Sequence, residues 1–212
     1  YERMLFNVGG PYIGVVLNYE EKVDRTSSLN LIKGNLSGKL FKTGKPSVGV
    51  IGAGLFGKAL LLPALKSLKN IELKTLSTSS SANVYHTAKK YGFFNCTTNY
   101  KEILEDKKIN SVVILTPHST HEKMIIEALK AGKHIFIEKP LCLSKEELNN
   151  ISFMKEKYPH LYLMVGYNRR YSLHSRKIKD YLKERKDPLT LLYRVNAGFV
   201  PASHRVHSEG EG

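Results

Sequence analysis

A short apolar run that leads directly into three spaced glycines is the strongest constraint on how this chain folds. Residues 48–51 are followed by Gly52, Gly54 and Gly57, the pattern Gly-x-Gly-x-x-Gly. The run is typical of a buried parallel strand, and apolar residues at helical spacing continue over 55–68. Such glycines permit a tight turn, the approach of a pyrophosphate and close helix–strand packing. The pattern predicts a dinucleotide-binding turn, with a purely structural turn as the alternative.

The start of the following helix belongs to the same expected site. Leu55 and Phe56 lie at its N-terminus, where free backbone N–H groups and the helix dipole favour phosphate. Pro63 should kink or shorten this helix, because it removes the hydrogen bond back to Ala59.

Strand-like and helix-like segments alternate between residues 47 and 165. Strands are expected at 48–52, 71–77, 111–116, 134–138 and 161–165. Helices are expected at 55–68, 82–91, 119–131 and 145–157, with a shorter one near 99–106. Ser119 or Thr120 and Ser144 are credible helix starts, because glutamates follow them. The alternation predicts an α/β fold: a doubly wound parallel Rossmann sheet with right-handed crossovers.

Three parts of the chain are expected. Residues 1–46 form an N-terminal extension with a strand at 12–17 and a linker-like stretch from 18, and residues 47–165 form the nucleotide-binding domain. Residues 166–212 begin an incomplete α/β substrate domain, with a basic helix at 171–186 and a strand at 189–195. This last part is too short for an independent core.

The composition is that of an ordinary globular protein, with 42% hydrophobic and 25% charged residues. We find neither an apolar run long enough for a membrane span nor a secretory signal. Cys96 and Cys142 suit neither a disulfide framework nor a zinc cluster. A cytoplasmic location without membrane contact is therefore the expectation.

The net charge of +14, from 33 Lys+Arg and 19 Asp+Glu, favours anionic ligands such as nucleotides. The densest basic patch consists of Arg169, Arg170, Arg176, Lys177, Lys179, Lys183, Arg185 and Lys186. There is no zinc-finger spacing and no aromatic–basic RNA signature. A solvated basic helix is favoured over a nucleic-acid surface.

The second expected strand ends in hydroxyl residues where an NAD site usually carries an acid. Ser77 and Thr78 are followed by serines at 79–81, with no carboxylate and no arginine. Hydroxyl groups can bind a 2′-phosphate without repelling it, so NADP fits at least as well as NAD. A solvated loop with a serine cap is the other interpretation.

The third expected strand ends in Thr116-Pro117-His118-Ser119-Thr120-His121. His118 and His121 could form a metal pair, but no cysteine or carboxylate stands nearby in ligand register. We therefore expect them to line the cofactor face or cap the following helix, with no metal bound.

The fourth expected strand, 134–137, leads into Glu138-Lys139-Pro140. A lysine here can meet a nicotinamide or a substrate hydroxyl, where its ammonium stabilises an alkoxide or moves a proton. A surface ion pair before a turn-forming proline explains the same residues equally well.

Together these motifs resemble the glucose–fructose oxidoreductase/inositol dehydrogenase (Gfo/Idh/MocA) family over about residues 47–200. The matching segments are Gly52-Ala53-Gly54-Leu55-Phe56-Gly57, Thr116-Pro117-His118 with His121, Ala131-Gly132-Lys133-His134, Glu138-Lys139-Pro140-Leu141 and Gly166-Tyr167-Asn168-Arg169-Arg170-Tyr171. The resemblance implies a Rossmann domain followed by an α/β domain with a large open sheet. It also implies oxidation or reduction of a sugar or cyclitol carbon with NAD(P).

The resemblance also implies roles for individual residues. Lys139 would contact nicotinamide and substrate, with Glu138 at the nicotinamide and a cis Lys139–Pro140 bond. Asn168 and Arg169 would lie at the junction with the substrate domain. Three further residues would border the cofactor: Thr116, Pro117 and His118.

Two features depart from the family pattern or extend beyond it. The family places an acid and a histidine, the latter commonly the proton carrier, in a glycine-rich segment early in the second domain. Residues 208–212 resemble only the approach to that segment, and His204 and His207 are not obvious substitutes. The resemblance therefore implies that the chain as given can lack activity. Residues 1–20 resemble the tail of a medium-chain zinc-type alcohol dehydrogenase domain, as in fused proteins where that domain precedes this one.

The predicted function is an NAD(P)-dependent oxidoreductase that acts on a sugar-like or cyclitol secondary alcohol or ketone, such as a nucleotide-linked sugar. The complete protein could be a homo-oligomer. A non-catalytic dinucleotide-binding or regulatory module is the alternative, and nucleic-acid binding through the +14 charge is a third hypothesis.

Overall fold

One mixed sheet organises the part of the chain that the computed structural model describes, residues 28–30, 45–194, 196, 198–199 and 201. Within these residues the strand order is β1-β4-β3-β2-β5-β6-β7. The strands are β1 (Ser28–Asn30), β2 (Ser47–Ile51), β3 (Glu72–Ser77), β4 (Asn95–Thr97), β5 (Ser111–Ile114), β6 (His134–Ile137) and β7 (Leu163–Val165). Strands β2 to β7 run parallel, and β1 pairs antiparallel with β4. The predicted doubly wound α/β fold is confirmed.

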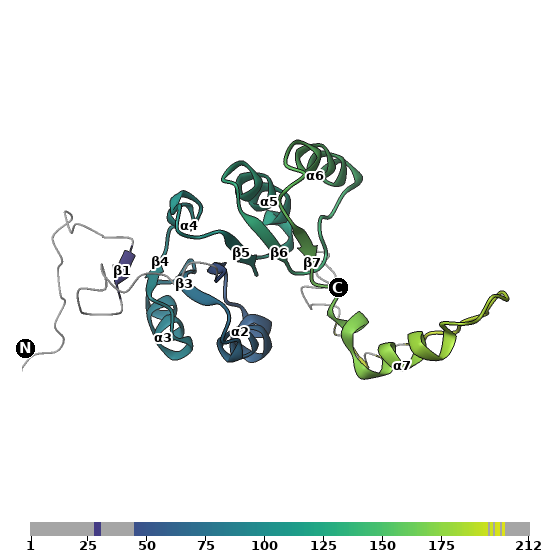
Figure 1. Cartoon of the computed structure of the whole chain (residues 1–212). Coiled ribbons are helices and arrows are strands. Elements are labelled where there is room, and N and C mark those ends of the chain that lie inside the picture. The colour runs from purple at the N-terminus through teal and green to yellow at the C-terminus, as the bar shows by residue number, and fades with distance from the viewer. Residues whose placement is uncertain (1–27, 31–44, 195, 197, 200, 202–212) are drawn as a thin grey trace, which may run out of the picture.

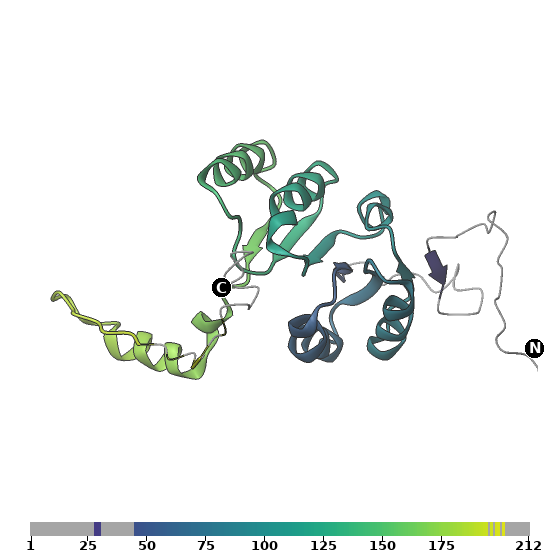
Figure 2. The same cartoon turned by 180° about the vertical axis from the view of Figure 1, so that it is seen from behind.

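Helices cover both faces of this sheet. They are η1 (Gly57–Leu61), α2 (Leu62–Ser67), α3 (Ser81–Tyr91), α4 (Lys101–Glu105), η2 (His118–Thr120), α5 (His121–Lys130), α6 (Lys145–Lys157), η3 (Asn168–Tyr171) and α7 (Leu173–Leu182). Figures 1 and 2 show α2 and α3 on one face, and α4, α5 and α6 on the other. Helix α7 extends away from the sheet in both views, and none of its residues is buried.

Alternating side chains of the central strands divide the core between the two faces. Val50 of β2 and Val113 of β5 join the apolar cluster under α2 and α3. Their neighbours Ile51 and Ile114 join the cluster under α4, α5 and α6. Because strand side chains alternate with a period of two, a continuous apolar run fills both layers.

The first helix passes through Pro63 without ending there. It takes a π-helical turn over Gly57–Leu61, in which the Leu62 N–H donates to the Gly57 carbonyl, and then continues as α2 to Ser67. A wider turn before the proline accommodates the missing N–H, so of the two expected effects, a kink or a shortening, the shortening does not occur. The Ser144 start is confirmed: its hydroxyl accepts from the Glu147 N–H at 3.1 Å.

Three expectations need correction. Strand β4 is absent from the predicted elements, because its three residues carry too short a pattern to distinguish from a loop. Part of the predicted linker, Ser28–Asn30, is a strand because β4 offers it an edge. Residues 189–194 form no strand, since within the described residues nothing pairs with them.

Some predictions lie outside the described residues: the strand at 12–17, the alcohol dehydrogenase-like segment 1–20, and residues 202–212. Among the residues that the structure describes, no helix is long and apolar enough to cross a membrane.

Candidate active site

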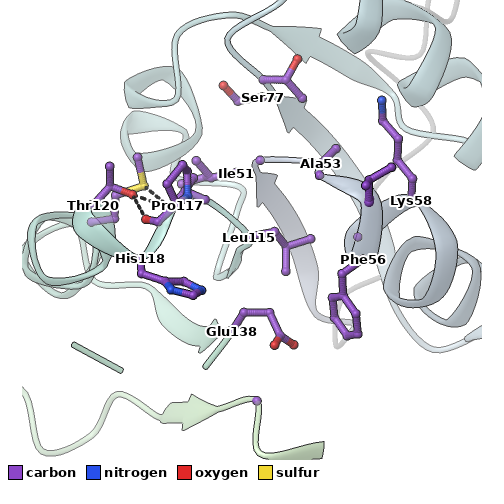
Figure 3. Close-up of a pocket in the computed structure, with 18 of the residues that line it drawn as sticks. Ile51, Ala53, Phe56, Lys58, Ser77, Leu115, Pro117, His118, Thr120 and Glu138 are labelled. Atoms are coloured by element: carbon purple, nitrogen blue, oxygen red, sulfur yellow. Dashed lines mark hydrogen bonds between the residues drawn. The ribbon is translucent and has the colours of Figure 1, made fainter. Parts of the chain in front are cut away.

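A cavity of about 1380 Å³ lies at the carboxyl ends of β2, β3, β5 and β6 (Figure 3). From β2 the chain proceeds to β3 and β4 on one side, then returns from β4 to β5 on the other side of β2 and continues to β6 and β7. The cavity therefore lies at the topological switch point, where doubly wound sheets bind ligands. Most of its wall comes from residues 51–58, 77–80, 115–118, 138–139 and 166–170. Every site residue predicted from the sequence lines this cavity except His121.

The three glycines of the loop after β2 meet different surroundings. Gly52 has φ of +90°, and a Cβ there would lie 2.6 Å from the Leu115 carbonyl oxygen. A Cβ on Gly57 would lie 2.9 Å from Leu115 Cδ1. A Cβ on Gly54 would meet nothing within 4 Å, since this position faces the open cavity. The first and third glycines therefore serve the fold, while the second leaves room for a ligand.

This difference predicts opposite effects of two matched substitutions. Gly54→Ala should change the free energy of unfolding by less than about 0.5 kcal/mol. It should nevertheless weaken binding of the dinucleotide expected from the sequence, NADH or NADPH, about tenfold, because its methyl group displaces phosphate from charge-assisted backbone hydrogen bonds. Gly52→Ala should cost about 1–3 kcal/mol through its left-handed backbone. Urea unfolding and nicotinamide fluorescence measure both quantities. Equal stability losses would contradict the assignment.

The end of β3 presents hydroxyl groups and no carboxylate. Ser77 and Thr78 line the cavity with serines 79 and 80, and the Ser77 carbonyl accepts the Gly52 N–H at 2.8 Å. The Thr78 hydroxyl donates to the Ser80 carbonyl at 3.0 Å. Glu138, at the end of β6, is the carboxylate among the described lining residues.

Sequence reasoning missed several lining residues, of which Lys58 is the most informative. Its position directly after the glycine loop is the sequence feature from which its place in the cavity wall could have been predicted. Its side chain extends beside that loop in Figure 3. Its carbonyl accepts the Tyr91 hydroxyl at 2.6 Å, which fixes its backbone against α3. The other missed residues include Asn83, Thr98, Tyr100, Tyr167 and Arg170.

Hydrogen bonds within the loop after β5 hold that loop in its conformation. The Thr120 hydroxyl lies 2.7 Å from both the Thr116 hydroxyl and the Pro117 carbonyl oxygen. In Figure 3 the His118 ring points into the cavity on the same side as the Glu138 carboxylate. Thr116, Pro117 and His118 thus form one wall, as their sequence position predicts.

His121 lies elsewhere than its sequence position predicts. Its side chain is fully buried, with Nδ1 2.6 Å from the Pro140 carbonyl oxygen and Nε2 3.1 Å from that of Thr116. It takes this position because it begins α5 on the face that packs against the sheet. Both ring nitrogens face these main-chain oxygens and the ring lies outside the cavity, so this side chain is not arranged to bind a metal with His118. The described residues contain no group of three or more potential metal ligands.

Glu138 and Lys139 lie together in the cavity wall at the end of β6. The Glu138 carboxylate accepts from Asn168 Nδ2 at 3.1 Å and from the Lys139 backbone N–H at 3.3 Å. A Cβ on Gly166 would lie 2.7 Å from Glu138 Oε1, so the glycine leaves space for that carboxylate. The Lys139–Pro140 peptide bond is cis.

Arg169 and Arg170 extend the same wall from η3. Arg169 donates to the Tyr193 hydroxyl at 3.3 Å, and Arg170 donates to the Val165 carbonyl at 3.3 Å. With Lys58 and Lys139, these groups give the described wall four cationic side chains against one carboxylate. The cavity therefore suits an anionic ligand.

A profile of the Gfo/Idh/MocA oxidoreductases, described as an oxidoreductase family with an NAD-binding Rossmann fold, matches residues 47–167. The chain belongs to this family. It is 35% identical over 122 residues to the Bacillus subtilis scyllo-inositol 2-dehydrogenase (NAD(+)), covering 58% of this chain and 35% of that protein.

Solved structures of Gfo/Idh/MocA-like proteins share its fold. A levoglucosan dehydrogenase in complex with NADH and L-sorbose is 30% identical with a TM-score of 0.61, covering 66% of this chain and 39% of that one. KijD10, a 3-ketoreductase from Actinomadura kijaniata in complex with NADP and TDP-benzene, is 25% identical with a TM-score of 0.61, covering 66% and 42%. This chain thus spans less than half the length of each of these relatives.

As a Gfo/Idh/MocA protein, the chain has NAD or NADP as its cofactor, and its residues fit that group. Gly54 leaves the loop open where a diphosphate approaches, and cations surround the cavity. The cavity volume exceeds the roughly 300–1,000 Å³ of drug-sized sites, so it has room for a dinucleotide.

Proposed function

We propose that the full-length protein is an NAD(P)-dependent oxidoreductase acting on a secondary alcohol or ketone of a sugar-like or cyclitol substrate. One observation carries this proposal: the glycine loop and the Glu138–Lys139 pair line the same cavity. The printed names of the relatives support the substrate class, since they include levoglucosan and inositol dehydrogenases. The TDP ligand of KijD10 extends the proposal to nucleotide-linked sugars.

The nicotinamide, when bound, supplies the acceptor or donor of a hydride. In the oxidative direction the substrate carbon gives up a hydride, and the hydroxyl on that carbon gives up a proton. We assign the transfer of this proton to Lys139 Nζ, which takes it up in the oxidative direction and returns it in the reductive direction. Glu138, held by Asn168, fixes the backbone beside Lys139 through the Lys139 N–H. Asn168 and Arg169, which line the same cavity, are assigned to substrate binding.

The direct test uses the full-length protein. NADH and NADPH are first titrated while bound-nicotinamide fluorescence is followed. Turnover is then measured with inositols, levoglucosan and nucleotide-linked ketosugars as separate candidates. Turnover of any of them supports the proposal. Cofactor binding without turnover of any member of this panel would contradict the proposed substrate class, and no binding would contradict the enzymatic proposal itself.

We further propose that the cofactor is NADP rather than NAD. Three features support this: hydroxyl groups at the end of β3, no carboxylate among the described lining residues there, and Lys58 beside the glycine loop. A 2′-phosphate next to these groups would gain charge-assisted hydrogen bonds. An NAD site would instead carry an acid for the ribose hydroxyls.

Thr78→Asp should reverse this preference. A carboxylate at the end of β3 repels a 2′-phosphate and accepts from ribose hydroxyls, so NADPH should bind about tenfold more weakly and NADH more tightly. Fluorescence titration with both cofactors measures the ratio. Ser152→Asp, which adds the same charge at an exposed position of α6, is the control and should leave the ratio unchanged. A wild-type preference for NADH would refute the NADP assignment.

A further inference from the structure

We propose that His121 is a positioning residue, which holds the backbone that carries Lys139 against the loop after β5. This inference rests on the proposed role of Lys139 at the reacting oxygen. The His121 side chain is 0% exposed and lies outside the cavity wall, so it does not touch a ligand. Both of its ring nitrogens face main-chain oxygens of loops that do line the cavity.

The place of His121 in the sheet explains why such a link is needed. Strands β5 and β6 pair in parallel register up to Ile114 and Ile137. The Glu138 N–H then donates to the Ile114 carbonyl at 3.2 Å. Beyond that bond the two strands continue into separate loops, and the His121 ring lies between them, with Nδ1 2.6 Å from the Pro140 oxygen and Nε2 3.1 Å from the Thr116 oxygen.

An apolar side chain would suffice if this position served packing alone. His121 begins α5, and the next buried positions on that helix, Ile125, Ala128 and Leu129, are all apolar. A buried imidazole is stable only where its polar atoms are hydrogen-bonded. Here the ring N–H donates to a main-chain carbonyl, and the nearer of the two acceptors is that of Pro140, the residue that follows Lys139. Because His121 itself follows the loop after β5, this hydrogen bond joins the two loops that flank the proposed reaction centre.

Variants can distinguish the two acceptors. A neutral imidazole carries one N–H and donates to one carbonyl, and the shorter contact is to Pro140. In His121→Asn the amide nitrogen lies near the Nδ1 position and can donate to Pro140. In His121→Gln it lies near the Nε2 position and can donate to Thr116. His121→Leu removes the hydrogen bond and keeps an apolar side chain in place.

The experiment measures the opening of these loops in the full-length protein. The readout is hydrogen exchange of the Glu138 backbone N–H, which donates to the Ile114 carbonyl where the two loops begin, relative to that of the Gly52 N–H, which donates to the Ser77 carbonyl at 2.8 Å. His121→Leu should raise this ratio roughly fivefold, the effect of one lost hydrogen bond on a local opening equilibrium. His121→Asn should restore most of the wild-type ratio, and His121→Gln should restore less, because Pro140 is the nearer acceptor to the ring.

Leu129→Ala is the matched control, since it opens a cavity in the same helix and the same core cluster. It should lower the melting temperature without changing the ratio. A rise with Leu129→Ala, or an unchanged ratio in folded His121→Leu and His121→Gln, would overturn the proposal. The measurement needs neither cofactor nor substrate, so it can succeed or fail independently of the proposed oxidoreductase activity.

Discussion

Lys139→Ala should lower kcat of the full-length protein about a hundredfold or more, the usual contribution of a positioned proton donor and acceptor. Lys139 lies in the cavity wall beside Glu138, at the end of β6. The glycine loop and the end of β3 do not depend on it, so the Kd for NADPH should rise by about fivefold at most, the effect of one hydrogen bond. Steady-state kinetics and fluorescence titration measure the two effects separately.

Lys145→Ala is the control for this substitution. Lys145 is exposed at the first position of α6, and its loss removes the same charge outside the cavity. Its kcat should match that of the wild type. An unchanged kcat in Lys139→Ala would remove Lys139 from the mechanism, whereas a Kd that rises as steeply as kcat falls would make it a cofactor-binding residue.

Asp106→Asn should destabilise the fold by about 3 kcal/mol, because it leaves buried cations without their carboxylate. Lys74 Nζ lies 2.5 Å from Asp106 Oδ2, and the side chain of Lys74 is only 6% exposed. Lys133 is buried beside them, and its ammonium donates to the carbonyls of Asp106 and Ile109 at 2.8 and 2.7 Å. Urea unfolding measures the loss.

Glu105→Gln provides the matched control. It removes the same charge one residue earlier, at an exposed position, and should change the free energy of unfolding by less than about 0.5 kcal/mol. Equal effects of the two substitutions would show that net charge, rather than the buried cluster, sets the stability.

The same cluster predicts how stability depends on pH. Burial alone would raise the pKa of Asp106, but the hydrogen bond and charge of Lys74 and the Lys108 N–H hold that pKa below its ordinary value. As the pH falls, Asp106 therefore takes up a proton in the unfolded chain at a higher pH than in the folded chain. The stabilisation by this carboxylate is present above about pH 4. It is lost as the pH falls through the folded-state pKa. Asp106→Asn should flatten this part of the wild-type curve.

For the neighbouring Lys133, burial shifts the pKa in the opposite direction. It lowers the pKa of Lys133, an effect that the nearby Asp106 charge opposes and the Lys74 charge reinforces. Lys74 lies in β3, Asp106 directly follows α4 and Lys133 directly precedes β6, and none of the three lines the cavity. The structure thus gives Lys133, in the Ala131-Gly132-Lys133-His134 segment, a structural role.

Local patterns in the sequence by themselves determined much of this fold. The glycine spacing, the apolar runs and the strand–helix alternation predict the doubly wound sheet, because each depends on residues close together in the chain. The Ser144 cap is predictable for the same reason. Rules for parallel sheets then place Thr116 and Lys139 at the same edge, since carboxyl ends of neighbouring strands meet there.

Tertiary structure alone decided the features that depend on contacts between distant residues. The burial of His121 follows from which face of α5 packs on the sheet and from two carbonyls on separate loops. Strand β4 exists because β3 and β1 pair with it, not because its three residues carry a strand pattern. The Lys74–Asp106 pair joins residues far apart in sequence. Packing and burial depend on residues that are distant in the sequence. A local pattern therefore does not predict which of these residues will contact one another in the low-dielectric interior.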